Sequence, residues 1–223
     1  MLRWLFCLVI ASAFSLTAIA QCACPDGIGA FAGDMPFLSI TTGDARHDLV
    51  LCGDAEKALS ETTWKASEFE VIECSGKKVL LSFGALEDCI VTKEAKDSIV
   101  IIKTVSLPLG KNRSFEDVPL DCYTIKANGA DGTKIHKVFV FAPPQYSTEQ
   151  AKEIMNLYHD AVANRKHGDD MDHIIGMIAL LAMSGSKEGQ AAFERASEDL
   201  KLDGCYGEYY GELYEIYREH YKK

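Results

Sequence analysis

Histidines and aspartates gather in one short stretch of the C-terminal half, and their side chains are of the types that bind zinc. The stretch runs from His159 to His173. Two consecutive helices would bring His159 or His167 toward His173, and neutral imidazoles and carboxylates are ligands that zinc takes. The spacing matches no recognised metal motif such as HExxH, and aspartates at a helix start also favour the positive end of its dipole. A zinc-dependent hydrolase is therefore the alternative interpretation, with these ligands: His159, His167, Asp170 and His173.

No other pattern in the sequence indicates catalysis. The chain has no Gly-x-Ser-x-Gly elbow and no cysteine whose neighbours suggest activation by histidine. Its 33 Asp and Glu residues are too many and too evenly spread to single out a glycosidase pair. Catalytic residues therefore stay unassigned, and the preferred interpretation is a non-catalytic binding or interaction protein.

Five tyrosines follow one face of the helix expected at the C-terminus. They are spaced four, four, three and four residues apart, which places their rings on one stripe. One interpretation is that the stripe packs on other helices. The other is that part of it stays exposed and binds a protein or carbohydrate, because tyrosine joins a large apolar face to a polar tip. The stripe consists of Tyr206, Tyr210, Tyr214, Tyr217 and Tyr221.

The cysteines are divided unequally between the two halves of the chain. In an oxidising compartment this division predicts up to three disulfides in the N-terminal half, although the sequence does not choose their connectivity. Their spacing contains no paired zinc knuckle. Cys205 has no evident partner and could join two copies into a homodimer. The six disulfide candidates are Cys22, Cys24, Cys52, Cys74, Cys89 and Cys122.

The N-terminus has the composition of an export signal. Arg3 precedes an apolar run that ends on Ala18-Ile19-Ala20, a small-x-small cleavage site. The run is short for an uncleaved anchor, which needs about 20 apolar residues. We therefore expect residues 1–20 to be a signal peptide, the mature chain to be periplasmic or extracellular, and no membrane association after signal removal.

Composition and charge limit the classes of partner that the protein is expected to bind. The formal net charge is −10 and no cluster of Lys and Arg is present, so nucleic acid is not expected as a partner. Hydrophobic residues make up 48% of the chain, which favours a folded core over disorder. Asn112-Arg113-Ser114 is an acceptor triplet for glycosylation if the source is eukaryotic.

A proline-rich segment, 141–147, separates a strand-patterned half from a helix-patterned half. Pro143 and Pro144 lack backbone donors and favour extended geometry before them, so no helix begins there. Ser147 and Gln150 then match a capping box. We expect a β domain over 21–143 and a helical domain over 147–223, packed together because the link is too short to be a free tether.

The β half reads as about eight short strands joined by turns, which predicts antiparallel pairing in a sandwich or partly open barrel. Residues 54–67 are expected to form a helical turn and a loop, and residues 107–119 a long polar loop. The helical half reads as four amphipathic helices with short links, which predicts an antiparallel four-helix bundle. The expected class is α+β, an exported protein with a disulfide-stabilised β domain and a helical docking domain.

Overall fold

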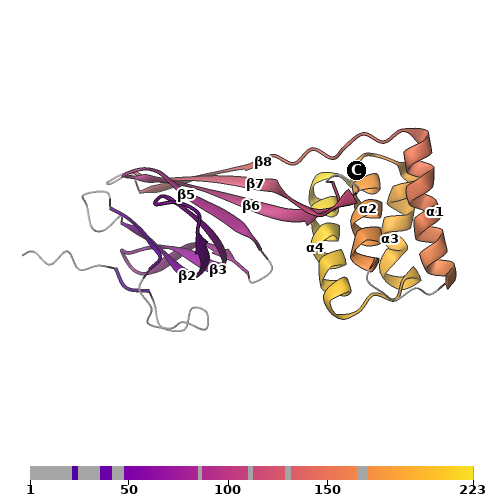
Figure 1. Ribbon diagram of the computed structural model, residues 1–223. Helices are drawn as coiled ribbons and strands as arrows, with labels where there is room; N and C mark the ends of the chain where they lie inside the picture. The colour runs from indigo at the N-terminus through magenta and orange to yellow at the C-terminus, as the bar shows by residue number, and fades with distance from the viewer. Residues whose placement is uncertain are drawn as a thin grey trace, which may run out of the picture.

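The structure is a computed structural model that describes residues 22–24, 36–41, 48–84, 87–109, 113–128, 132–164 and 170–222. Within these residues, eight strands in one antiparallel sheet precede four helices (Figure 1). The predicted α+β class with disulfides is confirmed. The predicted signal peptide, 1–20, lies outside the described residues.

The sheet is organised around one long, bent strand. The strands are β1 (Leu38–Ile40), β2 (Leu49–Ala58), β3 (Thr63–Glu73), β4 (Lys78–Phe83), β5 (Cys89–Ala95), β6 (Ser98–Leu107), β7 (Glu116–Ala127) and β8 (Thr133–Phe139). The beginning of β3 pairs with β5 and its end pairs with β4. Between the two segments Glu68 has a positive φ of 45°. Opposite this bend Gly53 has a φ of 136°, and a Cβ there would lie 2.3 Å from the Glu68 carbonyl oxygen.

The sheet curls so that distant strands share one core. Phe83 of β4 contacts Tyr123 of β7 edge to face, and both rings belong to the same cluster as Phe69. Two polar contacts also cross the curl: Thr133 of β8 donates to Glu73 of β3, and Lys93 of β5 donates to the Ser39 carbonyl of β1. This cluster is the sheet core.

Four helices follow the proline-rich link and build a second core. They are α1 (Thr148–Asn164), α2 (Met171–Met183), α3 (Lys187–Asp199) and α4 (Gly204–His220). The predicted capping box is confirmed, because Ser147 and Gln150 exchange backbone to side-chain hydrogen bonds at 2.9 and 3.2 Å. None of the helices in the described part of the chain is long and apolar enough to span a membrane.

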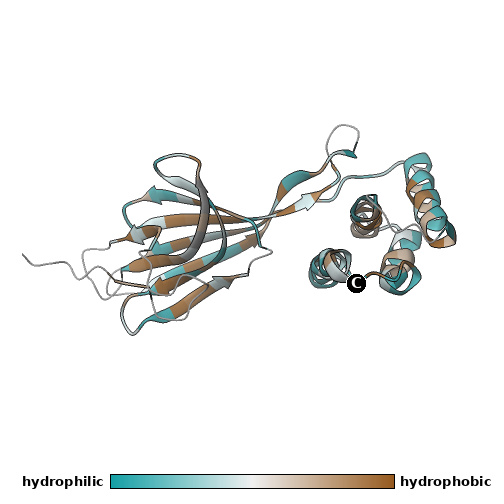
Figure 2. Cartoon of the chain, turned by 60° about the horizontal axis from the view of Figure 1, so that its bottom comes forward, coloured by the Kyte–Doolittle hydropathy of each residue, from teal (hydrophilic) through white to brown (hydrophobic). Residues whose placement is uncertain are grey.

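The β6–β7 hairpin belongs to both cores. Ile99 and Ile101 of β6 lie in the sheet core, whereas Val105 and Leu107 on the same face pack against the helices. A register shift between Lys103 and Thr104 marks the crossover. Figure 2 shows this pair of strands reaching out of the curled sheet toward the helices. We call the second cluster the helical core, although it includes residues of the hairpin.

Two predictions about local structure are wrong. Residues 54–67 form no helical turn: β2 continues to Ala58 and β3 begins at Thr63, because the two strands pair through Ala58 and Trp64. Residues 107–119 are only partly a loop, since β7 begins at Glu116. The first residues of β7 are polar because one face of the strand is exposed there. Pro119 is tolerated because it lies at the register shift, where a ladder hydrogen bond is not required.

Two disulfides attach the first described residues to the sheet. Cys22 is bonded to Cys74 and Cys24 to Cys52. The other two candidates, Cys89 and Cys122, are free, which corrects the expectation for them. They lie two strands apart, about 10 Å, and one residue out of register, so their side chains point to opposite faces of the sheet.

Candidate functional site

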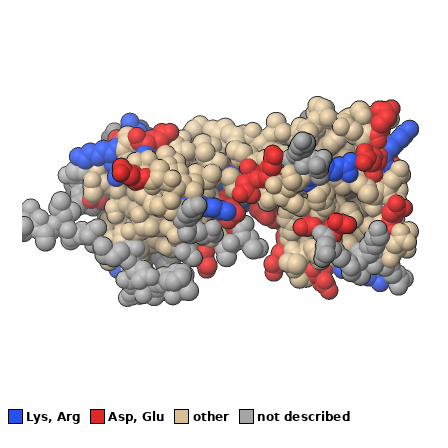
Figure 3. All heavy atoms as spheres, in the orientation of Figure 1, with Lys and Arg blue, Asp and Glu red and all other residues tan. Residues whose placement is uncertain are grey.

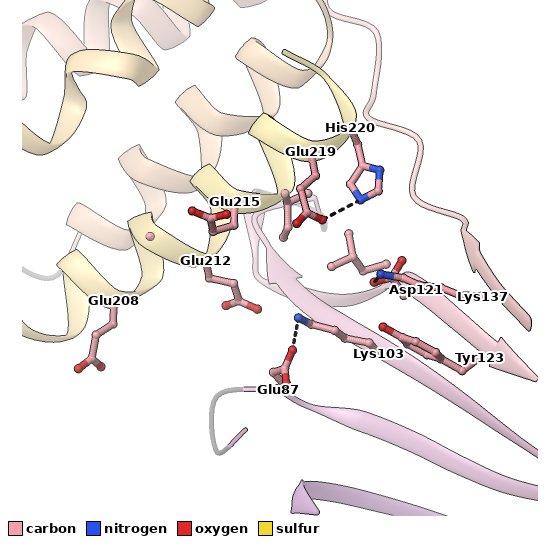
Figure 4. A pocket seen from close by; sticks show the side chains of 13 residues that line it. Glu87, Lys103, Asp121, Tyr123, Lys137, Glu208, Glu212, Glu215, Glu219 and His220 are labelled. Atoms are coloured by element: carbon pink, nitrogen blue, oxygen red, sulfur yellow. Dashed lines mark hydrogen bonds and ion pairs between the residues drawn. The ribbon is translucent and has the colours of Figure 1, made fainter. Parts of the chain in front are cut away.

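A cavity of about 600 Å³ lies where α4 faces the β6–β7–β8 part of the sheet (Figure 4). One wall is a row of glutamates on α4, spaced four, three and four residues apart, and this spacing places them on one helical face. The opposite face of α4 is apolar, with Leu213 and Tyr217 in the helical core. The glutamates of the wall, which we call the glutamate stripe, are Glu208, Glu212, Glu215 and Glu219.

The sheet supplies the other wall. Lys103 and Asp121 are cross-strand partners, and Tyr123 and Lys137 are partners in the next row of the same face. This face is the one that carries both cores, so the four polar side chains lie between two apolar regions. Leu120, which the register shift sets out of the ladder, adds an apolar floor.

Both lysines of the cavity already have acidic partners. Lys103 Nζ lies 2.5 Å from Glu87 Oε1, and Lys137 Nζ lies 3.0 Å from Asp121 Oδ2. The Lys137 ammonium also lies 5.4 Å from the centroid of the Tyr123 ring. The glutamate stripe therefore gains no close lysine partner from this wall in the described structure, apart from the longer-range field of Lys103.

Asp121 is the most deeply placed acid of the site. It is 5% exposed, and its Oδ1 atom is buried without any hydrogen-bond partner among the described residues. A buried carboxylate oxygen without a donor is costly, by roughly 1–3 kcal/mol or more for a charged group. The residue lines the cavity, so a donor in the cavity could remove this cost once the side chain turns to present Oδ1 to it.

The electrostatic field of the cavity is acidic. Its lining includes six carboxylates and two lysines, a formal charge of −4 with His220 neutral. Figure 3 shows acidic side chains along the junction between the sheet and the helices. Burial raises the pKa of Glu212, Lys103 lowers it, and the charges of Glu87 and Asp88 raise it further, so that its net shift is upward.

The same acidic surroundings favour the charged form of Lys103. Burial by itself favours the neutral amine, but the hydrogen bond to Glu87 and the charges of Glu87 and Glu212 outweigh burial. The pKa of Lys103 consequently lies above its ordinary value. The cavity thus stabilises positive charge even on a partly buried group, which is the property required of a cation-binding site.

An aromatic pair lies beside one end of the cavity. The rings of His220 and Phe139 stack with centroids 3.6 Å apart, and His220 Nε2 lies 3.7 Å from Glu219. Figure 4 shows His220 and Glu219 beside Asp121 and Lys137, whereas Glu208 lies toward the other end. The cavity therefore runs from Asp121 and His220 at one end to Glu208 at the other.

The predicted tyrosine stripe packs on the other face of α4. Tyr217 is buried, and the other four are partly buried against the helical core. Tyr210 donates to the Phe193 carbonyl and Tyr221 to the Phe141 carbonyl. This placement agrees with the packing interpretation, because Phe193 of α3 lies against three of the rings: Tyr210, Tyr214 and Tyr217. Binding of a protein or carbohydrate by the partly buried rings stays an untested prediction.

The residues of the alternative zinc site are not brought together in the described structure. Asp170 precedes α2, and His173 of α2 contacts Phe115 edge to face, with ring centroids 5.3 Å apart. His159 on α1 lies beside Tyr158. His167 and Asn112 lie outside the described residues. Among the described residues, no three His, Cys, Asp or Glu side chains form a group that could hold a metal ion.

Sequence reasoning missed the glutamate stripe and its partners on the sheet. The stripe had a signal, since its spacing is as regular as that of the tyrosines on the same helix. Lys103 and Asp121 had none, because only strand pairing places them side by side. Cys205 at the start of α4 is exposed and free, which leaves the predicted link between two copies untested.

Comparison with protein-family models, with curated proteins and with solved structures finds no match to this chain.

Proposed function

We propose that this protein is an exported, non-catalytic binding protein that takes a positively charged small molecule in the cavity between α4 and the sheet. The observation that carries the proposal is the buried Oδ1 atom of Asp121, which lacks a donor at the wall of an acidic cavity. A ligand ammonium or guanidinium group would supply that donor. It would also be attracted by the glutamate stripe.

The size and lining of the cavity support a small ligand. Sites for small molecules are typically cavities of about 300–1,000 Å³ with apolar walls and a few placed polar groups. Here Leu120, Ile216 and the Tyr123 ring supply apolar surface. A charge-assisted hydrogen bond to a buried carboxylate is roughly twice as strong as a neutral one, so Asp121 would fix the orientation of the ligand.

The two disulfides support export, because such bonds persist in oxidising compartments. In this proposal the mature chain begins after Ala20 and works in the periplasm or outside the cell. The curled sheet is then a partly open barrel, and the four helices form an antiparallel bundle that holds α4 as one wall of the cavity.

A panel of organic cations tests the proposal by thermal shift and calorimetry. We expect amines to raise the melting temperature of the wild type, and Asp121→Asn to weaken binding about tenfold or more because the amide carries no charge. Asp117→Asn is the matched control, since Asp117 lies on the same strand with an exposed side chain. A wild-type protein that binds no organic cation at millimolar concentration would contradict the proposal.

A further inference from the structure

The spacing of the acids along α4 narrows the class of ligand. The helical rise separates the four stripe residues by about 6, 4.5 and 6 Å, so the stripe runs for about 16 Å. Amines joined by three methylenes lie about 5 Å apart, and those joined by four lie about 6 Å apart. We infer that the ligand is a linear polyamine, with its first ammonium at Asp121 and the others opposite the glutamate stripe. This inference rests on the proposed function.

Gly211 supplies an independent reason for a linear chain. It lies on the stripe side of α4 and lines the cavity, and a Cβ added to it would meet no atom of the described residues within 4 Å. Glycine inside a helix is less favourable than alanine by about 1 kcal/mol. Because no protein neighbour requires a glycine here, we attribute it to the close passage of an aliphatic chain along α4.

The opposite wall suits the methylene segments of such a ligand. The Tyr123 ring and Leu120 on the sheet, together with Ile216 of α4, provide apolar contact between the charged groups. The ring also offers its face to an ammonium group, as it already does to Lys137. A polyamine alternates charge and methylenes in the same way that the cavity alternates carboxylates and apolar side chains.

Other cations match the geometry less well. A divalent metal needs several oxygen atoms around one point, whereas these carboxylates are spread along a line, and no group of three in the described residues could hold a metal. An arginine side chain carries a single charge and would leave most of the stripe without a partner. The line of acids instead favours a ligand with three or four charges.

Titration calorimetry with linear di-, tri- and tetra-amines tests the inference. We expect affinity to rise about tenfold with each added amine up to three or four, and to be lower for a branched triamine of equal charge. Magnesium and arginine are the comparison ligands. Equal affinity for linear, branched and metal cations would overturn the inference and leave the proposed function standing, whereas no binding of any cation would overturn both.

Two variants locate the chain along α4. Glu208→Gln removes an exposed carboxylate at the end of the cavity away from Asp121. We therefore expect about tenfold weaker binding of the tetra-amine and unchanged binding of the diamine at Asp121. Gly211→Leu fills the passage, and we expect weaker binding of the tri- and tetra-amines, unchanged binding of the diamine at Asp121, and no fall in melting temperature. Gly207→Leu, on the same helix but not in the cavity lining, is its control.

The outcome that contradicts this arrangement is equally specific. If Glu208→Gln weakens the diamine and the tetra-amine by the same factor, the ligand does not extend along the stripe. If Gly211→Leu folds and binds linear amines as the wild type does, no chain passes over Gly211. Either result would reduce the site to a general cation site centred on Asp121.

Discussion

At the scale of single residues, the cavity is a place where stability and binding oppose each other. Lys103 and Lys137 neutralise Glu87 and Asp121, and Glu215 pairs with Arg218 on α4. Partly buried Glu212 is a disfavoured charge in the empty protein, and a ligand that supplies positive charge would stabilise it. Sites that bind or react commonly have this cost.

The loss of stability caused by the Glu212 carboxylate should depend on pH. Its pKa in the folded protein lies above the ordinary value of 4.5, chiefly because of burial. Between these two pKa values the folded protein binds more protons than the unfolded chain, so this residue lowers stability as pH rises through the window. We expect Glu212→Gln to melt at a higher temperature than the wild type at pH 7 and at the same temperature below pH 4.5.

The control for this measurement is Glu198→Gln on α3, which removes an exposed carboxylate outside the cavity. Its melting temperature should differ little from that of the wild type at any pH. The Glu212→Gln variant should also bind cations more weakly than the wild type. A Glu212→Gln variant that is less stable at pH 7 would contradict the assignment of Glu212 as a buried, disfavoured charge.

The free cysteines differ sharply in their expected reactivity. Burial, together with the charge of Glu87, raises the pKa of the Cys89 thiol to about 12, and the side chain is fully buried. At pH 8 only about one Cys89 in 10⁴ is then a thiolate, the reactive form. We expect iodoacetamide to modify exposed Cys205 in the native protein and to leave Cys89 unmodified until the chain unfolds.

Peptide mapping after such labelling also checks the disulfides. Cys22, Cys24, Cys52 and Cys74 should stay unlabelled in native and unfolded protein until a reductant is added. Rapid labelling of Cys89 in the native state would show that the inner face of β5 opens to solvent, contrary to its position in the sheet core.

At the scale of secondary structure, α4 explains both the success and the failure of the sequence analysis. Its two stripes, one of tyrosines and one of glutamates, are equally visible in the sequence. Period alone does not say which stripe is covered by neighbouring helices and which faces a cavity. Phe193 of α3 decides this by packing on the tyrosines, and it lies far from them in sequence.

The helices were predictable because their signals are local. Ser147 and Gln150 cap α1, and Ser186 caps α3 by accepting from the Gly189 amide, as short-range patterns indicate. The end of the β6–β7 hairpin was not predictable from local signals. The strands continue past Lys103 only where the helices cover Val105 and Leu107. The Asp121 site depends on that continuation, so it was not predictable either.

Gly176 tests how closely the hairpin approaches α2. A Cβ at this position would lie 2.7 Å from Pro108 Cδ and 2.9 Å from Tyr209 Oη. Tyr209 itself donates to the Ser106 carbonyl, so neither neighbour moves freely. We expect Gly176→Ala to destabilise the protein by about 1–3 kcal/mol in urea unfolding, although alanine is the better helix former.

The matched control is Gly211→Ala on α4, where an added Cβ meets nothing within 4 Å. Here only helix propensity changes, so we expect a gain in stability of up to about 1 kcal/mol. Equal effects of the two substitutions would mean that the hairpin does not press on α2 as described.

At the scale of the whole molecule, the β6–β7 hairpin contributes side chains to both cores. The strands β6 and β7 supply Ile99 and Ile125 to the sheet core and Val105 and Leu107 to the helical core. Removing the helices would leave the end of the hairpin exposed, and removing the sheet would leave the helical core incomplete. The cavity lies at this junction, so it exists only when both cores are folded.

The last prediction is that the sheet and the helices unfold in one transition. Trp64, the single tryptophan after the predicted signal peptide, packs on the sheet core, so its fluorescence reports the sheet. Ellipticity at 222 nm reports the helices. Coincident curves from the two probes indicate a two-state transition.

Leu107→Ala in the helical core, with a side chain 1% exposed, should cost about 2–5 kcal/mol and lower both melting midpoints by at least about 4 °C. Leu59→Ala, 50% exposed, should leave them nearly unchanged. A Leu107→Ala protein whose ellipticity melts early while Trp64 fluorescence melts as in the wild type would show that the hairpin does not couple the two cores.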